Sequence, residues 1–213
     1  MNGEKIRNIL EWIGCIIIAV VLALLIKYYV ATPTEVKSIS MEKTLIEGQR
    51  LVLDRTQRTF HKELQRGDIV TFEAPSEIQL ENNAENEKAP IAKYNYSPKG
   101  LINTFNYYVL ENTKTSYIKR VIGLPGEHVK IENGKVYING NVLNETYLRS
   151  GITTTASNAI LTDFIVPEGT VFLMGDNRPD STDCRRFGCI PLEKIESKVW
   201  IRIWPLNLFG EVD

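Results

Sequence analysis

Cysteine and histidine are both scarce in this sequence, and their positions argue against two classes of small protein. There are three cysteines and two histidines among 213 residues. Cys15 lies inside a long apolar run, far along the chain from Cys184 and Cys189, so the cysteines do not form the framework of a disulfide-rich secreted module. Neither Cys184 nor Cys189 has a histidine or a third cysteine nearby in the sequence, which argues against a zinc site. We expect free thiols rather than a bridge.

The sequence also lacks an excess of charge of either sign. Lys and Arg total 25 against 26 Asp and Glu, so the net charge is -1 at pH 7 and the pI is near 6.2. A domain that binds nucleic acid through its overall field is strongly basic, so we expect no nucleic-acid partner. A mass of 24.2 kDa fits one folded domain of moderate size together with an anchor.

One long apolar run lies near the N-terminus. Every residue from 12 to 26 is apolar or glycine, and the apolar residues flanking it bring the run to about the 20 residues that cross a hydrocarbon core. A cleaved signal peptide ending near Ala31 is the alternative, but the run is long for one and no clean small-x-small site follows. We expect a transmembrane anchor at 9–30. Its orientation stays open, because basic residues occur on both sides.

The chain beyond the anchor has the pattern of a mostly β protein. Short runs rich in β-branched and aromatic residues are separated by turns containing Gly, Pro and Asn. Asn-Gly occurs twice around one of these runs and predicts a hairpin. A short helix is expected near 190–195, and the polar region 73–115, which sustains no period, is expected to be an excursion on the domain surface. We expect strands at 50–54, 67–72, 117–122, 129–131, 135–138, 171–174 and 199–204.

A polar stretch at 38–45 follows the anchor closely, and we interpret Ser40 within it as a nucleophile. A serine hydroxyl is a weak nucleophile unless a base removes its proton. His61, His128 and Lys119 are the candidate bases. Lys119 could act only if burial lowered its pKa by several units from the free value near 10.4, and its apolar strand could provide that burial. The residues by themselves leave the choice of base open.

Charged and hydroxyl side chains are dense in the loop at 175–188, directly after a predicted apolar strand. Carboxylate and guanidinium groups this close can lock a loop through paired hydrogen bonds, and a hydroxyl such as Ser181 could orient a catalytic amine. A purely structural ion-pair loop is the alternative. In the predicted strand at 117–122, earlier in the chain, alternation places Lys119 and Arg120 on opposite faces of the sheet.

Taken together, these segments resemble the type I signal peptidases, the bacterial membrane-anchored Ser-Lys proteases, in their form with a single N-terminal anchor. Several motifs in the family's order are far more specific than any one alone, and only 73–115 and 146–163 are left without a match. The matching segments are the anchor, Ser40 and Met41 with Thr44 and Leu45, 66–70, 117–127, 175–178 with Ser181, Asp183 and Arg185, and 202–206.

The resemblance implies a mostly β fold: a β-rich catalytic core with a small inserted β cap, preceded by one transmembrane helix. It implies a membrane-anchored serine endopeptidase that cleaves signal peptides from secretory preproteins after Ala-x-Ala through an acyl-enzyme, without metal or organic cofactor. The partners would be preproteins and membrane lipid. The chain would be a monomer in the plasma membrane with its catalytic domain extracytoplasmic. The implied divisions are a cytoplasmic N-terminus at 1–8, the anchor at 9–30, the core at 31–128 and 168–213, and the cap at 129–167.

The resemblance also implies a role for each residue that matches a family motif. Ser40 is the nucleophile and Lys119 the general base. Ser38 and the backbone N–H of Ser40 would form the oxyanion hole, a kind of donor typically worth roughly 3 to 4 kcal/mol in the acylation transition state. The supporting residues would be Ser181, which positions the lysine, Asp183 and Arg185, which brace the site, and Val36 and Ile118, which line shallow apolar pockets for small residues.

Three positions depart from the family pattern. Lys43 stands where the family usually has proline, Cys184 replaces a serine, and Glu196 with Ser197 replaces small residues that include glycine. Two rival interpretations remain beside the peptidase. Cys184 could be the nucleophile of a sortase-like transpeptidase, with Arg185 or Arg186 as oxyanion donor and His128 as partner, or the chain could be an inactive, membrane-tethered relative that binds partners.

Overall fold

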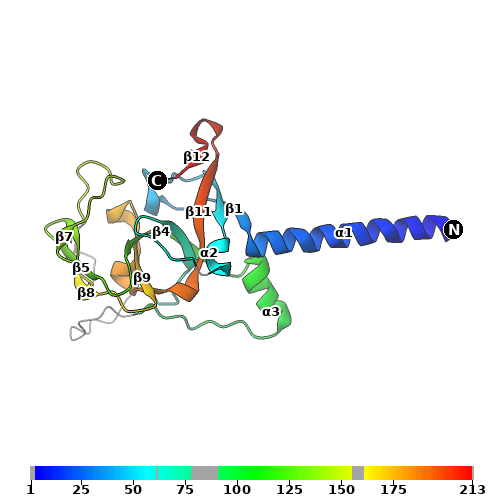
Figure 1. The fold of residues 1–213 in the computed structure, drawn as a ribbon, viewed down its shortest axis with the longest axis horizontal. Helices are drawn as coiled ribbons and strands as arrows, with labels where there is room; N and C mark the ends of the chain where they lie inside the picture. Colours follow the sequence, from blue (N-terminus) through cyan, green and yellow to red (C-terminus); the bar gives the residue numbers. More distant parts are fainter. Residues whose placement is uncertain (1–2, 61, 78–90, 155–160, 213) are drawn as a thin grey trace.

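A computed structural model describes residues 3–60, 62–77, 91–154 and 161–212. Helix α1 (Gly3–Tyr29) projects away from the rest of the chain (Figure 1). Its segment Arg7–Tyr29 has a mean hydropathy of 2.9 over its most apolar window, none of which is buried against the protein. It is the one helix among the described residues that is long and apolar enough to cross a membrane.

Eight strands form the main sheet, and each neighbouring pair is antiparallel. The order is β1-β2-β11-β3-β4-β9-β10, and β12 pairs with β11. The predicted strands at 50–54, 67–72, 117–122, 171–174 and 199–204 all lie in it. The bounds are β1 Ala31–Glu35, β2 Arg50–Asp54, β3 Ile69–Glu73, β4 Ser116–Gly123, β9 Thr170–Met174, β10 Ile190–Pro191, β11 Ile195–Trp204 and β12 Gly210–Glu211.

Strand β11 begins four residues before the predicted strand at 199–204. Ile195 and Ser197 pair with Phe72 and Thr71 of β3. The extension was not predicted because residues 196–198 are polar and do not continue the apolar pattern of the strand. Glu196 and Ser197 are nevertheless buried, through tertiary contacts.

A second sheet of four strands has the order β7-β6-β5-β8 (β5 His128–Glu132, β6 Lys135–Ile138, β7 Asn141–Val142, β8 Asp163–Ile165). The predicted hairpin is present, and its turn residues Asn133 and Gly134 both have positive φ, as a type I′ turn requires. The ring of Phe164 in this sheet packs at a tilt against that of Phe172 in β9, with centroids 4.8 Å apart, and both belong to one apolar cluster. The sheet begins at His128, one residue before the cap expected at 129–167, and otherwise lies within it. The subdivision stays a prediction, because the two sheets share a core.

The region expected to be an excursion contains helical structure that the sequence pattern did not predict. Of 73–115, residues 78–90 lie outside the described part of the chain. Helix α3 (Leu101–Phe105) continues into a π-helical turn, η2 (Asn106–Leu110), beside the domain end of α1 (Figure 1). Tyr107 is buried and its hydroxyl donates to Glu73 at 2.7 Å. Tertiary anchoring of this kind, rather than helix propensity, accounts for so short a helix.

The remaining helical elements are single turns that connect strands. The short helix expected near 190–195 is present as η4. The turns are η1 Ile39–Met41, α2 Thr56–Thr59, η3 Arg178–Asp180, α4 Cys184–Phe187, η4 Leu192–Lys194 and η5 Leu206–Leu208.

Candidate active site

Ser40 lies on η1, a one-turn 3-10 helix shortly after β1, and it is 3% exposed. Ser38 caps this turn, since its Oγ accepts a hydrogen bond from the backbone N–H of Ser40 at 3.2 Å. Serine is a preferred N-cap residue because its oxygen satisfies an N–H group that has no partner within the helix. The cap therefore holds Ser40 on a defined turn and brings its N–H together with the Ser38 hydroxyl.

Lys119 lies on β4 and reaches Ser40 from the sheet. Its Nζ donates to Ser40 Oγ at 2.7 Å and to the carbonyl oxygen of Ile118 at 3.0 Å. The residue is 3% exposed, and burial lowers the pKa of Lys119 to about 8, although the carboxylates of Asp183 and Asp176 act in the opposite direction. A lysine whose pKa is this low is partly neutral near pH 7 and can accept a proton.

The loop after β9 holds the backbone around Ser40. Asn177 donates from its backbone N–H to Ser40 O at 3.0 Å and from Nδ2 to Ile39 O at 3.1 Å. Gly175 permits this close approach, because a Cβ there would lie 2.4 Å from Ser40 O and 2.3 Å from Ser181 Oγ. The serine turn and the loop are thus packed directly together.

Asp183 and Arg185 form a buried pair that closes this loop on itself. Arg185 Nε donates to Asp183 Oδ1 at 2.8 Å and Arg185 Nη2 donates to Oδ2 at 2.9 Å, a bidentate arrangement. Burial alone would raise the pKa of Asp183, but the bonds from Arg185 and from the backbone N–H of Gly175 hold that pKa below its ordinary value. The aspartate therefore stays ionised, which satisfies the buried guanidinium.

Ser181 is bonded to this pair. Its Oγ donates to Asp183 Oδ2 at 2.7 Å. No hydrogen bond between Ser181 and Lys119 occurs among the described residues. The contact that Ser181 makes toward the lysine is therefore indirect, through a carboxylate whose charge raises the pKa of Lys119.

The opposite face of β4 carries a second buried ion pair, as the predicted alternation requires. Arg120 donates to Asp176 from Nε at 3.0 Å and from Nη2 at 2.8 Å, and Asp176 Oδ2 also accepts from Thr44 Oγ1 at 2.6 Å. Thr44 follows the serine turn and Asp176 follows β9. This cluster joins the segment after the serine turn to the loop after β9, on the face of the sheet opposite to Lys119.

A cleft of about 710 Å³ runs along the Ser40 face of the sheet. Val36 and Ile118, the residues expected to line apolar pockets, are both on its wall. The same cleft extends to Lys27 at the end of α1 and to Leu110 at the end of η2. Ser40 and Lys119 thus line a cleft that continues to the C-terminal end of the apolar helix.

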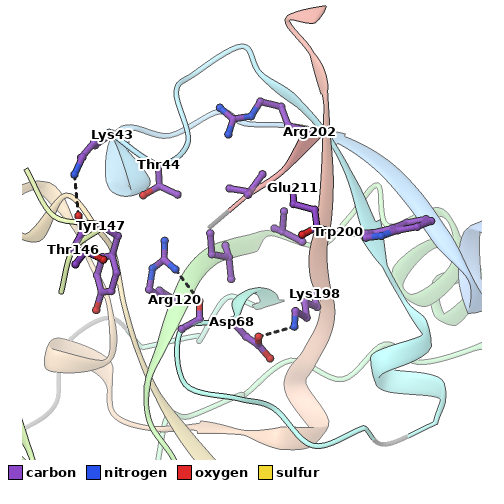
Figure 2. Close-up of a pocket in the computed structure, with 14 residues that line it drawn as sticks. Lys43, Thr44, Asp68, Arg120, Thr146, Tyr147, Lys198, Trp200, Arg202 and Glu211 are labelled. Carbon is purple, nitrogen blue, oxygen red and sulfur yellow. Dashed lines mark hydrogen bonds and ion pairs between the residues drawn. The ribbon is translucent and has the colours of Figure 1, made fainter. Parts of the chain in front are cut away.

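A second cavity of about 800 Å³ lies on the other face of the sheet, where Arg120 projects (Figure 2). Figure 2 shows Lys43 directed to Thr146 at one rim and Lys198 paired with Asp68 at the opposite side, at 2.6 Å. Ser40 and Lys119 do not line it. We therefore place the chemistry in the cleft rather than in this second cavity.

Lys43, the most unexpected residue of the serine stretch, has a backbone conformation that proline cannot adopt. Its φ is 87°, whereas the proline ring holds φ near -65°. Its Nζ donates to the carbonyl oxygens of Thr146 and Leu148, at 3.1 Å and 2.8 Å. The lysine therefore links the serine stretch to the segment that leads away from the second sheet, and a chain with proline here must follow a different path.

We expect Lys43→Pro to lower the free energy of unfolding by about 2 kcal/mol or more. The proline ring cannot adopt the positive φ of this position, and the two hydrogen bonds from Lys43 Nζ are lost. Lys43→Gly is the matched control: it loses the same bonds but accepts the backbone angle. Urea unfolding of both variants in detergent measures the difference. A Lys43→Pro variant as stable as Lys43→Gly would contradict the observed backbone path.

The geometry does not favour the rival centres. His128 lies in the second sheet, where its Nε2 is 2.6 Å from Asp163 Oδ1 at the surface, and it does not line the cleft. His61 lies outside the described residues. Cys184 and Cys189 are free and buried, and burial raises the pKa of the Cys184 thiol well above its ordinary value. A neutral, inaccessible thiol is a poor nucleophile, so the sortase-like interpretation loses its central residue.

Comparison with known proteins identifies the family to which the chain belongs. The family described as "Signal peptidase, peptidase S26" matches residues 9–204. The chain belongs to this family. It is accordingly a serine peptidase, and the prediction made from the motif order is confirmed.

Two relatives match this signal peptidase over nearly its whole length, and one solved structure matches about two thirds of it. A probable signal peptidase I-1 of Synechocystis sp. is 34% identical over 202 residues, covering 95% of this chain and 86% of the relative. Signal peptidase I of Bacillus licheniformis is 32% identical over 218 residues, covering 100% and 97%. A crystal structure of a signal peptidase I from Enterococcus faecalis V583 is 28% identical, covers 64% of this chain and 97% of its own, and has a TM-score of 0.40.

Some residues that assemble the site were given no role in it from the sequence, although they lie in segments that match the family. Asn177 holds the backbone of Ser40, and Asp176 joins Thr44 to Arg120. The signal available was the run of polar residues directly after an apolar strand, which marks a loop at the end of a sheet but not its partners. No group of three or more His, Cys, Asp or Glu in the described part of the chain is placed to hold a metal ion.

Proposed function

We propose that this signal peptidase removes signal peptides from secretory preproteins by a Ser40–Lys119 dyad that works through an acyl-enzyme. The observation that carries the proposal is the 2.7 Å hydrogen bond between Lys119 Nζ and Ser40 Oγ at the wall of a cleft. The family match supports the substrate class, and the lowered pKa of Lys119 supports its role as base.

Acylation begins when neutral Lys119 takes the proton of Ser40 and Oγ attacks the carbonyl carbon of the scissile peptide. The oxyanion accepts hydrogen bonds from the Ser40 backbone N–H and the Ser38 hydroxyl, which already lie together in the free enzyme. For this, the N–H must exchange the Ser38 oxygen for the substrate oxygen. The ammonium of Lys119 then protonates the leaving amine, and the mature protein departs.

Deacylation uses the same groups, with water as the nucleophile and Ser40 as the leaving group. Lys119, neutral again, removes a proton from water, and the hydroxide attacks the ester carbonyl. Collapse of the second tetrahedral intermediate returns the proton to Ser40 Oγ and releases the signal peptide. Asp183 with Arg185 braces the loop that holds Ser40, and Ser181 acts through Asp183.

The preference for small residues at the cleavage site follows from the cleft wall. Val36 and Ile118 both line the cleft that contains Ser40, and we expect their branched side chains to favour alanine over a larger residue there. We expect the chain to act as a monomer.

The apolar helix would anchor the enzyme in the plasma membrane with its catalytic domain extracytoplasmic, where preproteins emerge. Residues 1–8 would then lie in the cytoplasm. The main sheet would be the catalytic core and the second sheet the inserted cap.

Cleavage of matched preproteins tests this function. We expect the purified full chain in detergent to cut a preprotein whose signal peptide ends in Ala-x-Ala, and mass spectrometry to place the new N-terminus directly after the final alanine. A preprotein with leucine in place of that alanine should be cut at least ten times more slowly, since it does not fit the pocket. Equal cleavage of the two preproteins would contradict the proposed specificity. If neither preprotein is cleaved, the proposed function is wrong.

A further inference from the structure

Residues 101–110 present an apolar helical face that the described protein leaves largely exposed at one end and partly exposed at the other. Leu101 is 91% exposed, Ile102 78% and Phe105 43%, and Tyr108 is also exposed. Positions 101, 105 and 108 follow helical spacing, so their side chains share one side of α3 and η2. Tyr107 is buried against the domain. No residue from 101 to 110 is charged, in a chain of which 24% is charged.

This face lies next to the point where α1 leaves the domain. Lys27 Nζ, near the end of α1, donates to the carbonyl oxygen of Leu110 at 2.9 Å. Figure 1 shows α3 on the side of the domain from which α1 projects. The apolar segment Arg7–Tyr29 ends at this level, and Tyr28 and Tyr29 there are residues typical of the membrane interface. The helical segment that carries the exposed face therefore lies beside the domain end of the apolar helix.

The segment after η2 is tied firmly to the main sheet. Glu111, which turns the chain at φ 57°, accepts from Arg55 Nη1 at 2.8 Å and lies 3.3 Å from Lys114 Nζ. Lys114 Nζ also pairs with Glu196 of β11 at 2.5 Å. These four side chains are largely buried. Buried ion pairs thus join the end of the helical segment to the sheet that carries Lys119.

The segment also forms part of the substrate cleft. Leu110, Glu111 and Lys114 line the cleft that contains Ser40, together with Lys27 of α1. The end of η2 is therefore at the mouth of the cleft that lies nearest to α1. Contact of 101–108 with a bilayer would place that mouth at the membrane surface.

We propose that the face formed by Leu101, Ile102, Phe105 and Tyr108 inserts into the headgroup region of the bilayer and sets the height of the cleft above the membrane. The proposal rests on the membrane anchoring in the proposed function. A lipid surface fits this face better than a protein partner does, because the face is uncharged, carries aromatic rings and adjoins the anchor.

Depth measurements in liposomes test the proposal without reference to catalysis. In a Cys15→Ala background, single variants Ile17→Cys, Ile102→Cys and Val142→Cys are labelled with an environment-sensitive fluorophore and reconstituted in phosphatidylcholine and phosphatidylglycerol vesicles. Val142 is the matched control, since it is an exposed apolar residue on β7 at the far end of the domain from α1 (Figure 1). We expect blue-shifted emission and quenching by brominated lipids at 17 and 102, and neither at 142.

The outcomes separate this inference from the anchor and from self-association. Quenching at 17 but not at 102 would overturn the inference and leave the anchor intact. Emission from position 17 that is typical of a label in water would contradict both the membrane anchor and this inference. A blue shift at 102 that disappears when the lipid-to-protein ratio is raised would show a contact between copies of the chain, which also overturns it.

A paired activity assay gives the functional consequence. Leu101→Glu with Ile102→Glu should slow processing of a preprotein in the same liposomes several-fold, while cleavage of a soluble peptide in detergent is unchanged. Val142→Glu should change neither. An equal loss in detergent would indicate damage to the fold rather than loss of a membrane contact.

Discussion

Ser40→Ala should abolish preprotein cleavage, with a fall in kcat on the order of 10⁴- to 10⁶-fold, the range found when the nucleophile of a serine protease is removed. The expected loss is this large because no other hydroxyl in the described cleft accepts a hydrogen bond from Lys119: its two acceptors are Ser40 Oγ and Ile118 O. Initial rates on a preprotein in detergent, followed by gel and mass spectrometry, measure it.

Ser38→Ala provides the matched contrast on the same turn. It should lower kcat by roughly 10²- to 10³-fold through loss of one oxyanion donor, with KM little changed. It also removes the N-cap of η1, which should cost about 1 kcal/mol of folding free energy. A similar residual activity in Ser40→Ala and Ser38→Ala would sink the assignment of Ser40 as nucleophile.

Activity should decrease on the acid side with the titration of Lys119. Burial lowers the pKa of Lys119 to about 8, so the neutral base predominates above that pH and is protonated below it. Below about pH 7, kcat/KM should therefore fall about tenfold for each pH unit. A rate profile from pH 5.5 to 9.5, with folding checked by circular dichroism at each end, measures this limb.

Lys119→Met separates the base from the structural role of the side chain. Methionine has a similar length and no charge, so the buried site should keep its packing while catalysis is lost. Thermal stability should be equal or higher, since a buried amine is no longer desolvated. His128→Ala should leave both the rate and the acid limb unchanged. An acid limb that disappeared with His128 and persisted in Lys119→Met would reverse the assignment.

One departure from the family pattern acquires a physical reason in the structure. Glu196 stands where small residues were expected, and its carboxylate meets Lys114 from the segment that follows η2. Lys114 belongs to 73–115, a region that the family resemblance left without a match. The two unusual features are therefore partners: the acidic residue on β11 is the attachment point of the helical segment beside α1.

Local sequence determined the parts of this protein whose physics is local. Apolar length predicted α1, alternation predicted β4 with Lys119 and Arg120 on opposite faces, and Asn133 with Gly134 predicted a hairpin turn. The candidate dyad could be named because its motifs occur in a fixed order along the chain. Each of these signals is contained within a few residues, which is the range over which propensity and period act.

Tertiary structure alone decided which side chains meet. Ser40 and Lys119 are 79 positions apart, and nothing in the local sequence of either indicates a 2.7 Å contact. The burial that lowers the pKa of Lys119 exists only once the sheet and the loop after β9 have packed. The helix at 101–110 was missed for the same reason: Tyr107 and Glu73 stabilise it from 34 positions apart, and no local period marks it. Contacts between distant segments, unlike turns and strands, depend on the whole fold.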